Sequence, residues 1–212
     1  MIKAELIPGS LKQNVRLMIR PIADVFSKWG ISPNMMTLLG VVLSGVAAAY
    51  FATFHIRYGG LFYMLAGFCD IFDGAMARRQ GRGSSFGAFL DSTLDRFAEA
   101  IALLGVMVYF HRSGVTPMVY VTYLAVISSM LVSYTKSRAE GLGQDCNVGL
   151  LERPERVTCV VVGALLFGDY GLKVSMVLMM ILAFFTVGQR MHHTWRGFMI
   201  KEKEANKDIL SN

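Results

Sequence analysis

Charged residues are scarce in this chain of 212 residues. Asp, Glu, Lys and Arg together make up 17% of it, whereas 54% is hydrophobic and the mean hydropathy is +0.46. Water-soluble domains carry about 25% charged residues. The composition therefore excludes a pair of soluble domains and favours a single bundle of helices in a membrane.

Cysteine is also rare, which limits two further classes of protein. The three cysteines, Cys69, Cys146 and Cys159, are odd in number and lack the spacing of metal ligands, so we expect free thiols and no disulfide framework. Residues 1–32 are polar and basic, and the first long apolar run follows them. A signal peptide is therefore not expected at this end.

Long apolar runs, in contrast, recur along the chain. Six are long enough, or nearly so, to cross about 30 Å of hydrocarbon as helices of roughly 20 residues. We predict an all-α integral membrane protein, a single domain over 1–212 with a six-helix bundle at 34–200. Residues 10–28 alternate apolar and basic positions at helical spacing, which is typical of an interfacial amphipathic helix. The predicted spans are 34–54, 59–78, 86–110, 116–137, 154–168 and 171–191.

The basic residues predict the orientation of these spans. Of the 21 Lys and Arg residues, seventeen fall on the side that holds both termini, three (Arg57, Arg112 and Lys173) fall on the other, and Arg96 lies within the third span. The positive-inside rule then places both termini in the cytoplasm. The net charge of +6 needs no nucleic acid to explain it, because lipid headgroups and phosphorylated substrates are nearer partners.

Four aspartates interrupt the apolar pattern, and they are the most informative feature of the sequence. Asp70, Asp73, Asp91 and Asp95 lie within 26 residues. A carboxylate at membrane depth costs at least about 2.5–3.5 kcal/mol, so the set needs compensating cations. The two members of each pair are three or four residues apart and share one helix face. Because their two spans are antiparallel, we expect all four carboxylates to converge at one depth, below the cytoplasmic surface.

The donor set indicates the kind of cation. Four oxygen ligands with no Cys or His nearby suit Mg²⁺ or Mn²⁺, and four carboxylates can hold two such ions. Gly74 and Gly87 allow a ligand to approach the helix backbones closely. Arg78 lies about one turn from the acidic pair, where it can bind a phosphate that bridges to metal. The ordinary alternative, acidic and basic groups paired with each other at helix ends, explains a single aspartate better than the spaced set.

The complete pattern resembles the signature of the CDP-alcohol phosphotransferases. These are membrane enzymes with six transmembrane helices that join a CDP-linked moiety to an alcohol and release CMP. The resemblance extends over nearly the whole chain. The pattern reads Asp70-x-x-Asp73-Gly74-x-x-Ala77-Arg78, eight residues, and then Gly87-x-x-x-Asp91-x-x-x-Asp95.

The resemblance implies a role for each position. Asp70, Asp73 and Asp91 would bind two Mg²⁺ or Mn²⁺ ions, and Asp95 would contribute to metal binding and act as the general base. The donor would be CDP-diacylglycerol or its archaeal counterpart, and the enzyme would contact membrane lipids as a homodimer. The residues implied in binding the CDP-lipid are Asn34, Thr37, Asp70, Gly74, Arg78, Ser84 and Gly87.

The segment from 136 to 156 indicates which alcohol the enzyme would accept. It carries four cations on the predicted side of the metal site, Lys136, Arg138, Arg153 and Arg156. A neutral alcohol does not need four cations, whereas Arg and Lys bind phosphate oxygens directly. The segment also resembles, more loosely, that of the phosphatidylinositol-phosphate and archaetidylinositol-phosphate synthases. We therefore expect inositol phosphate as the acceptor, with glycerol phosphate next and serine or inositol behind it.

Other readings of the charged residues stay open. Juxtamembrane cations often only set topology and touch lipid headgroups, and Arg190 is interpreted in this way, with contact to the acceptor as the alternative. Intramembrane carboxylates on paired helices also occur in ion pathways, so a small cation transporter is the competing class. The spacing of Gly74, Arg78 and Gly87 has no explanation in a transporter. A positive charge beside the acidic cluster would also oppose cation passage.

Overall fold

The computed structural model describes residues 30–79 and 85–211, and all of their regular structure is helical. The predicted juxtamembrane helix at 10–28 and Ser84 lie outside the described residues. Four of the helices begin and end within a few residues of the first four predicted spans. The helices are α2 (Pro33–Ala52), α3 (Ile56–Arg79), α4 (Ser85–Arg112), α5 (Thr116–Gly141) and α6 (Arg153–Ser211).

Local signals in the sequence set the starts of several helices. At the start of α2, the Ser32 side chain accepts a hydrogen bond of 3.3 Å from the Met35 backbone N–H, and Pro33 occupies the first helical turn. Both features are typical of helix N-termini. Proline stands in the same place in α5 and directly after Arg153 in α6. These prolines fix where each helix enters the bundle.

The predicted spans 154–168 and 171–191 form the two segments of α6. Gly168 separates them with a non-helical backbone (φ 58°, ψ −131°), which a glycine adopts without a steric penalty. The segments pack closely, because a Cβ on Gly163 would overlap Ser175 and the backbone of Gly171. The second segment continues to Ser211, well beyond the predicted end. Its last turns contain several Lys and Glu residues, which favour helix without being apolar.

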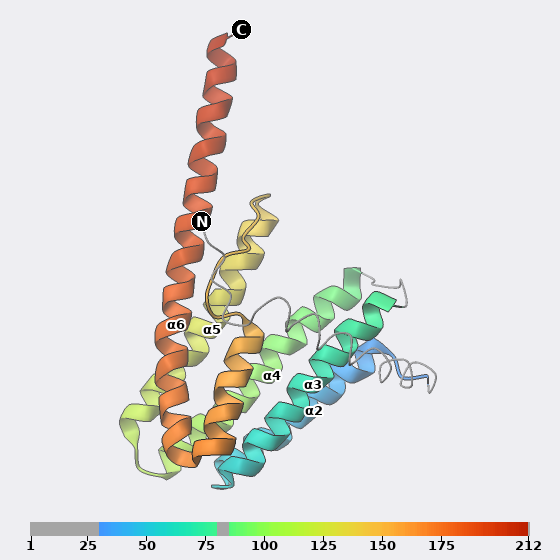
Figure 1. Ribbon diagram of the computed structural model, residues 1–212, viewed down its shortest axis with the longest axis vertical. Helices are drawn as coiled ribbons and strands as arrows, with labels where there is room; N and C mark the ends of the chain where they lie inside the picture. Colours follow the sequence, from blue (N-terminus) through green and yellow to red (C-terminus); the bar gives the residue numbers. More distant parts are fainter. Residues whose placement is uncertain (1–29, 80–84, 212) are drawn as a thin grey trace.

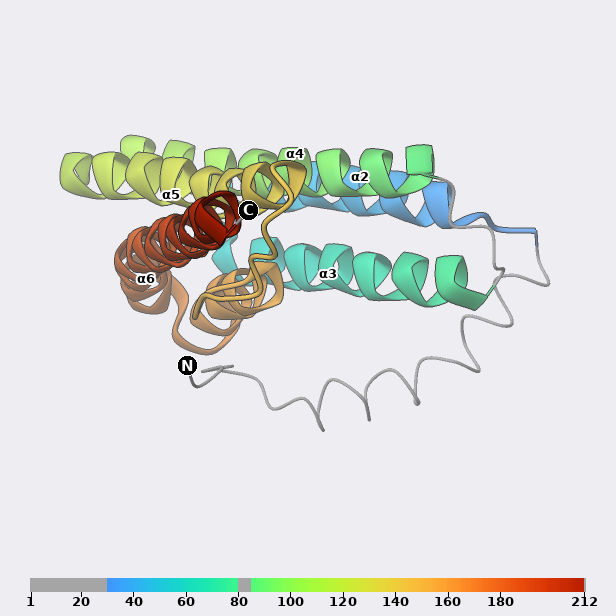
Figure 2. The same ribbon diagram turned by 90° about the horizontal axis from the view of Figure 1, so that it is seen from above.

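The helices form a closed ring in which each packs most extensively against two neighbours. Following the contacts, α2 packs on α3, α3 on α6, α6 on α5, α5 on α4, and α4 back on α2. Seen from above, α5, α4 and α2 lie in one layer, with α3 and α6 in a second (Figures 1 and 2). Gly105 lets α4 approach α2 closely, since a Cβ there would overlap the backbone of Ala48. The two helices that carry the aspartates, α3 and α4, thus share α2 as a common neighbour.

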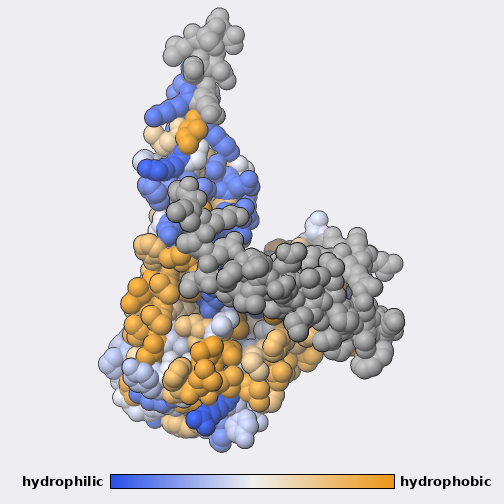
Figure 3. Space-filling view, viewed as in Figure 1, coloured by the Kyte–Doolittle hydropathy of each residue, from blue (hydrophilic) through white to orange (hydrophobic). Residues whose placement is uncertain are grey.

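The surface of the bundle is suited to a membrane. Three described helices, α2, α5 and α6, are long and apolar enough to cross one. The other two, α3 and α4, carry the charged residues of the site. Large apolar side chains are exposed over the lower part of the face in Figure 3, and hydrophilic ones follow the C-terminal end of α6. Leu166, Phe167 and Tyr170 are each more than 60% exposed. Apolar exposure on this scale indicates contact with a partner or with lipid.

Candidate functional site

Three of the four predicted aspartates form one cluster. Asp70 comes from α3, whereas Asp91 and Asp95 are one turn apart on α4, and one carboxylate oxygen from each lies within 4.8 Å of the other two. All three are half-buried. The structure therefore confirms that the two helices bring these carboxylates to one place, from the C-terminal half of α3 and the N-terminal half of α4.

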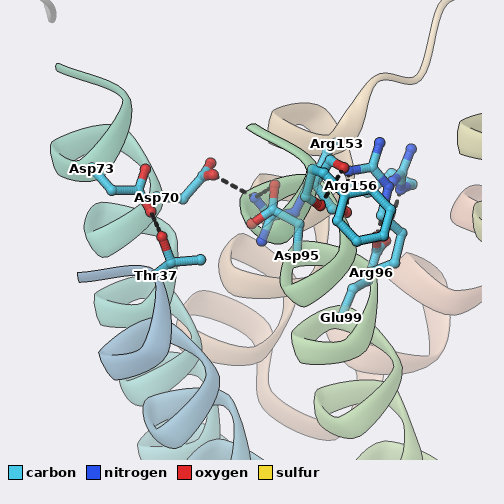
Figure 4. A network of polar contacts seen from close by, with 10 residues as sticks. Thr37, Asp70, Asp73, Asp95, Arg96, Glu99, Arg153 and Arg156 are labelled. Atoms are coloured by element: carbon cyan, nitrogen blue, oxygen red, sulfur yellow. Dashed lines mark hydrogen bonds and ion pairs between the residues drawn. The ribbon is translucent and has the colours of Figure 1, made fainter. Parts of the chain in front are cut away.

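Asp73 belongs to the same region but has a different partner. It is almost fully buried, and its Oδ2 accepts a hydrogen bond of 2.8 Å from Thr37 Oγ1 on α2. Its other oxygen, Oδ1, has no hydrogen-bond partner among the described residues. Thr37 thus orients Asp73 from the neighbouring helix and leaves one oxygen available as a ligand (Figure 4).

Arg153, the first residue of α6, reaches into the aspartate cluster. Its Nη1 lies 2.7 Å from Asp70 Oδ1 and 2.8 Å from Asp95 Oδ2, so one guanidinium nitrogen bridges α3 and α4. The side chain is 19% exposed. The sequence places Arg153 among the acceptor cations, and the structure adds that its guanidinium is in direct contact with two predicted metal ligands.

Arg156 lies one turn further along α6 and is fully buried. Its Nε and Nη2 donate hydrogen bonds of 2.7 and 2.9 Å to the two carboxylate oxygens of Glu99, and its Nη1 donates one of 3.3 Å to the Leu151 carbonyl. Ser129 on α5 donates a further hydrogen bond of 2.7 Å to Glu99. Arg156 thus holds α4, α6 and the α5–α6 loop together. For Arg156 to contact an acceptor as predicted, its ion pair with Glu99 would have to open.

Glu99 is a residue of this region that the sequence reasoning missed. It follows Asp91 and Asp95 at four-residue intervals on α4, so the three acids form one stripe along the helix. That interval is the only signal in the sequence that could have found it. Arg153 and Arg156 form the matching stripe on α6, and the two stripes pair acid with base in the same order (Figure 4).

Arg190 is buried and bonded to the backbone, whereas a cation that only sets membrane topology would be exposed near lipid headgroups. It is 3% exposed, and its guanidinium donates hydrogen bonds to the carbonyls of Val148, at 2.9 Å, and Val132. Gly149 makes room for this contact, since a Cβ there would lie 3.3 Å from Arg190 Nε. Arg190 therefore fastens the α5–α6 loop to α5 and to the second segment of α6.

The remaining predicted residues surround this centre more loosely. Lys136 and Arg138 lie near the C-terminal end of α5, where Lys136 is 3.9 Å from Glu140 and Arg138 is exposed. Asn34 is exposed in the first turn of α2. Gly74 follows Asp73 directly, and Gly87 lies in the first turn of α4. Arg78 belongs to α3, but its side chain lies outside the described residues.

The residues of the cluster fit a hard divalent cation. Asp70, Asp91 and Asp95 offer only oxygen atoms, which are the ligands that Mg²⁺ and Mn²⁺ prefer. The buried Oδ1 atoms of Asp73 and Asp91 have no hydrogen-bond partner among the described residues. A buried carboxylate oxygen without a donor is costly unless a cation satisfies it. The structure therefore supports a site for divalent metal built from α3 and α4.

Solved structures of phosphatidylinositol phosphate synthase from Mycobacterium tuberculosis are similar to this chain in sequence and in fold. The one with CDP-DAG bound has a TM-score of 0.76 and 32% sequence identity, and the match covers 84% of this chain and 93% of that one. A second, in complex with manganese and citrate, has a TM-score of 0.75 at the same identity, covering 84% and 88%. The manganese structure agrees with the metal site inferred here.

Curated relatives and a family model identify the chain at the level of sequence. Phosphatidylinositol phosphate synthase of Mycobacteroides abscessus is 38% identical over 91% of this chain and 87% of its own length. Archaetidylinositol phosphate synthase of Methanothermobacter thermautotrophicus is 35% identical over 86% of this chain and 91% of its own. The model of the CDP-alcohol phosphatidyltransferase family matches residues 30–188. The signature aspartates and their metal-binding geometry lie inside that match, and this chain belongs to the CDP-alcohol phosphatidyltransferase family.

Proposed function

We propose that this enzyme transfers a phosphatidyl or archaetidyl group from a CDP-linked lipid to inositol phosphate and releases CMP. The observation that carries the proposal is the joining of Asp70, Asp91 and Asp95 with the arginine-bearing start of α6. A pyrophosphate donor needs cations, and a phosphorylated acceptor needs basic side chains; this centre has the ligands for the first and the basic residues for the second.

The reaction is a displacement at phosphorus. The acceptor hydroxyl oxygen forms a bond to the phosphorus that carries the lipid, the bond from that phosphorus to the CMP oxygen breaks, and CMP leaves with the electron pair. The carboxylate of Asp95 accepts the proton that the hydroxyl loses. Bound Mg²⁺ or Mn²⁺, held by Asp70, Asp73, Asp91 and Asp95, would neutralise and orient the pyrophosphate.

The other residues bind and orient the two substrates. Thr37 holds Asp73 in place through its 2.8 Å hydrogen bond. Asn34, Gly74, Arg78, Ser84 and Gly87 are proposed to contact the nucleotide end of the CDP-lipid. On the acceptor side, Lys136, Arg138 and Arg153 are proposed to bind the phosphate. Arg156 is a weaker candidate for this role, because its guanidinium is paired with Glu99.

The proposal includes the arrangement in the membrane. Six spans are supported by α2 to α5 together with the two segments of α6, which Gly168 separates. The excess of Lys and Arg on the side that holds both termini supports an orientation with the aspartate end and both termini in the cytoplasm. A homodimer is part of the same proposal, and light scattering of the purified protein in detergent measures it directly.

The experiment that tests the function is an acceptor panel with purified protein, CDP-diacylglycerol and Mg²⁺ or Mn²⁺. Release of radiolabelled CMP should depend on inositol phosphate, with glycerol phosphate the next best acceptor and free inositol and serine poor ones. Equal use of free inositol or serine would remove the phosphate-binding role of the cations. Cation flux into proteoliposomes without CMP release from any acceptor would favour a transporter instead.

A pair of variants tests the acceptor side more sharply. Arg138→Gln removes an exposed cation at the aspartate end of the bundle, and Arg57→Gln removes an exposed cation at the opposite end. Loss of a charge-assisted hydrogen bond to phosphate costs about 1.5–3 kcal/mol. The KM for inositol phosphate should therefore rise roughly tenfold or more in Arg138→Gln only, with the KM for CDP-lipid unchanged in both.

A further inference from the structure

Arg153 contacts carboxylate oxygens of two of the three clustered aspartates that would hold a divalent ion. Its Nη1 is 2.7 Å from Asp70 Oδ1 and 2.8 Å from Asp95 Oδ2, and both residues belong to the cluster that fits a metal. Mg²⁺ binds carboxylate oxygens at about 2.0–2.1 Å. An ion bound to these oxygens would lie a few ångströms from the guanidinium, and the two positive charges would repel each other strongly in a half-buried site.

The neighbouring arginine shows that Arg153 is the less firmly held of the two. All three nitrogens of Arg156 donate well-formed hydrogen bonds, two of them to Glu99 as a bidentate pair. Nε of Arg153 is buried without a hydrogen-bond partner among the described residues, and Nη1 is within ion-pair distance of two oxygens without aligned hydrogen bonds. Arg153 is therefore held by charge rather than by hydrogen-bond geometry, and another anion can replace its partners.

The position of Arg153 in the chain allows such an exchange. It is the first residue of α6, directly after the α5–α6 loop, and its side chain is 19% exposed. The pair of Arg156 and Glu99 anchors the helix one turn later and keeps the backbone of Arg153 in place. The guanidinium can then turn between the aspartates and the acceptor side without any movement of α6.

We propose that Arg153 competes with the divalent cation for Asp70 and Asp95, and that the phosphate of the acceptor relieves this competition by binding Arg153. The second half rests on the proposed function, whereas the first half does not. Binding of metal and of acceptor phosphate is then mutually favourable. Thermodynamic linkage requires each to tighten the other by the same factor. The arginine thus couples the two sites without a separate regulatory element.

The first test measures metal alone, with no substrate present. The affinity of the purified protein for Mn²⁺, followed by the electron paramagnetic resonance of the free ion, is compared in wild type, Arg153→Gln and Arg96→Gln. Arg96 is the matched control: it follows Asp95 in α4, is half-buried, and its guanidinium bonds to the Ser92 carbonyl. We expect Mn²⁺ to bind about tenfold more tightly to Arg153→Gln, a change of about 1.4 kcal/mol.

The control separates direct competition from a general effect of charge. Arg96→Gln should tighten Mn²⁺ binding clearly less than Arg153→Gln does, because it removes a nearby charge without freeing a ligand oxygen. Equal tightening in both variants would overturn the competition, as would unchanged or weaker binding in Arg153→Gln. If that variant fails to keep its helix content, Arg153→Met takes its place. Methionine keeps a flexible, unbranched side chain but carries no charge, so unchanged or weaker Mn²⁺ binding there would also overturn the competition.

The second test adds inositol phosphate at saturation. In wild type the Mn²⁺ affinity should rise about tenfold, and most of this gain should vanish in Arg153→Gln, because its ligand oxygens are already free. The same gain in both would mean that phosphate reaches the metal directly, which overturns the coupling. No gain in wild type, together with no CMP release on inositol phosphate, would reject the proposed acceptor. The substrate-free comparison would still decide the competition.

Discussion

Asp91 and Asp95 are one helical turn apart on α4, yet the structure gives them different surroundings. Oδ1 of Asp91 is buried without a hydrogen-bond donor among the described residues, whereas Asp95 contacts Arg153. The first environment suits a residue that only binds metal. The second suits a residue that also meets the acceptor, because the cation beside it is proposed to bind the acceptor phosphate.

We expect Asp91→Asn to abolish CMP release and to weaken Mn²⁺ binding, because the amide removes a charged ligand from a site of three carboxylates. Both are measured on purified protein, the second by metal titration. Asp169→Asn is the control, since Asp169 bonds to Tyr109 and Lys173 at the far end of the bundle. A metal-dependent Asp91→Asn enzyme with normal turnover would contradict the metal assignment.

Asp95→Asn should lower turnover by roughly 10²–10⁴-fold, the range for the loss of a general base, while binding of the CDP-lipid persists. Single-turnover CMP release and equilibrium binding of the CDP-lipid, measured on the same preparation, separate the two effects. Collapse of lipid binding along with turnover would make Asp95 mainly a metal ligand or a structural residue.

At the level of the helices, ion pairs as well as apolar packing fix how far one helix is shifted along its neighbour. Glu99 and Arg156 are each 1% exposed, are 57 residues apart in sequence, and join α4 to α6. Their register also sets the height of Arg153, one turn away on the same face of α6. The start of α6 is therefore positioned for chemistry by a pair that does not itself contact the aspartate cluster.

Glu99→Gln should destabilise the bundle by about 3–5 kcal/mol, because it leaves the buried Arg156 guanidinium without its counter-charge. The matched change Glu140→Gln removes the exposed partner of Lys136, at 3.9 Å, and should cost less than about 1 kcal/mol. Unfolding of both variants in mixed detergent micelles gives the two free energies. Similar losses in the two would mean that the buried pair adds nothing beyond an ordinary surface contact.

The whole molecule separates polar chemistry from the lipid-facing surface. The charged residues of the site come together from α3, α4 and α6, whereas large apolar side chains such as Leu166 and Phe167 are exposed. Figure 3 shows hydrophobic surface over much of the lower part of the molecule and hydrophilic surface along the C-terminal part of α6. This distribution suits an enzyme whose CDP-lipid keeps its lipid chains in the membrane, while the cytidine end of that lipid and the acceptor face the water. In the proposed arrangement, the site lies where hydrocarbon and water meet.

The proposed topology predicts which ends of the molecule are accessible from each side of the membrane. A cysteine introduced at Ser113, in the turn between α4 and α5, should react with a membrane-impermeant maleimide on intact cells. One at Lys201, near the C-terminal end of α6, should react only after lysis. The unmodified chain controls for its own three cysteines. The reverse pattern would invert the orientation and place the aspartates outside.

Much of this protein follows from its sequence because the relevant signals are local. Apolar runs of helical length predict the elements, and Pro33, Pro117 and Pro154 mark helix starts close to the observed ones. The spacing of the aspartates predicts that each pair shares a helix face. The convergence of Asp70 with Asp91 and Asp95 also follows from sequence, because a short connection makes α3 and α4 antiparallel. Helix geometry and chain length suffice for all of these.

Tertiary structure decided which charge pairs with which. Sequence alone presents Arg153 and Arg156 as equivalent acceptor cations, yet one bridges Asp70 and Asp95 and the other is committed to Glu99. It also presents Arg190 as a residue that sets topology, whereas it is buried against the α5–α6 loop. These partners come from helices far apart in the chain. Which groups meet depends on the rotation and register of each helix in the packed ring, and local spacing does not encode these.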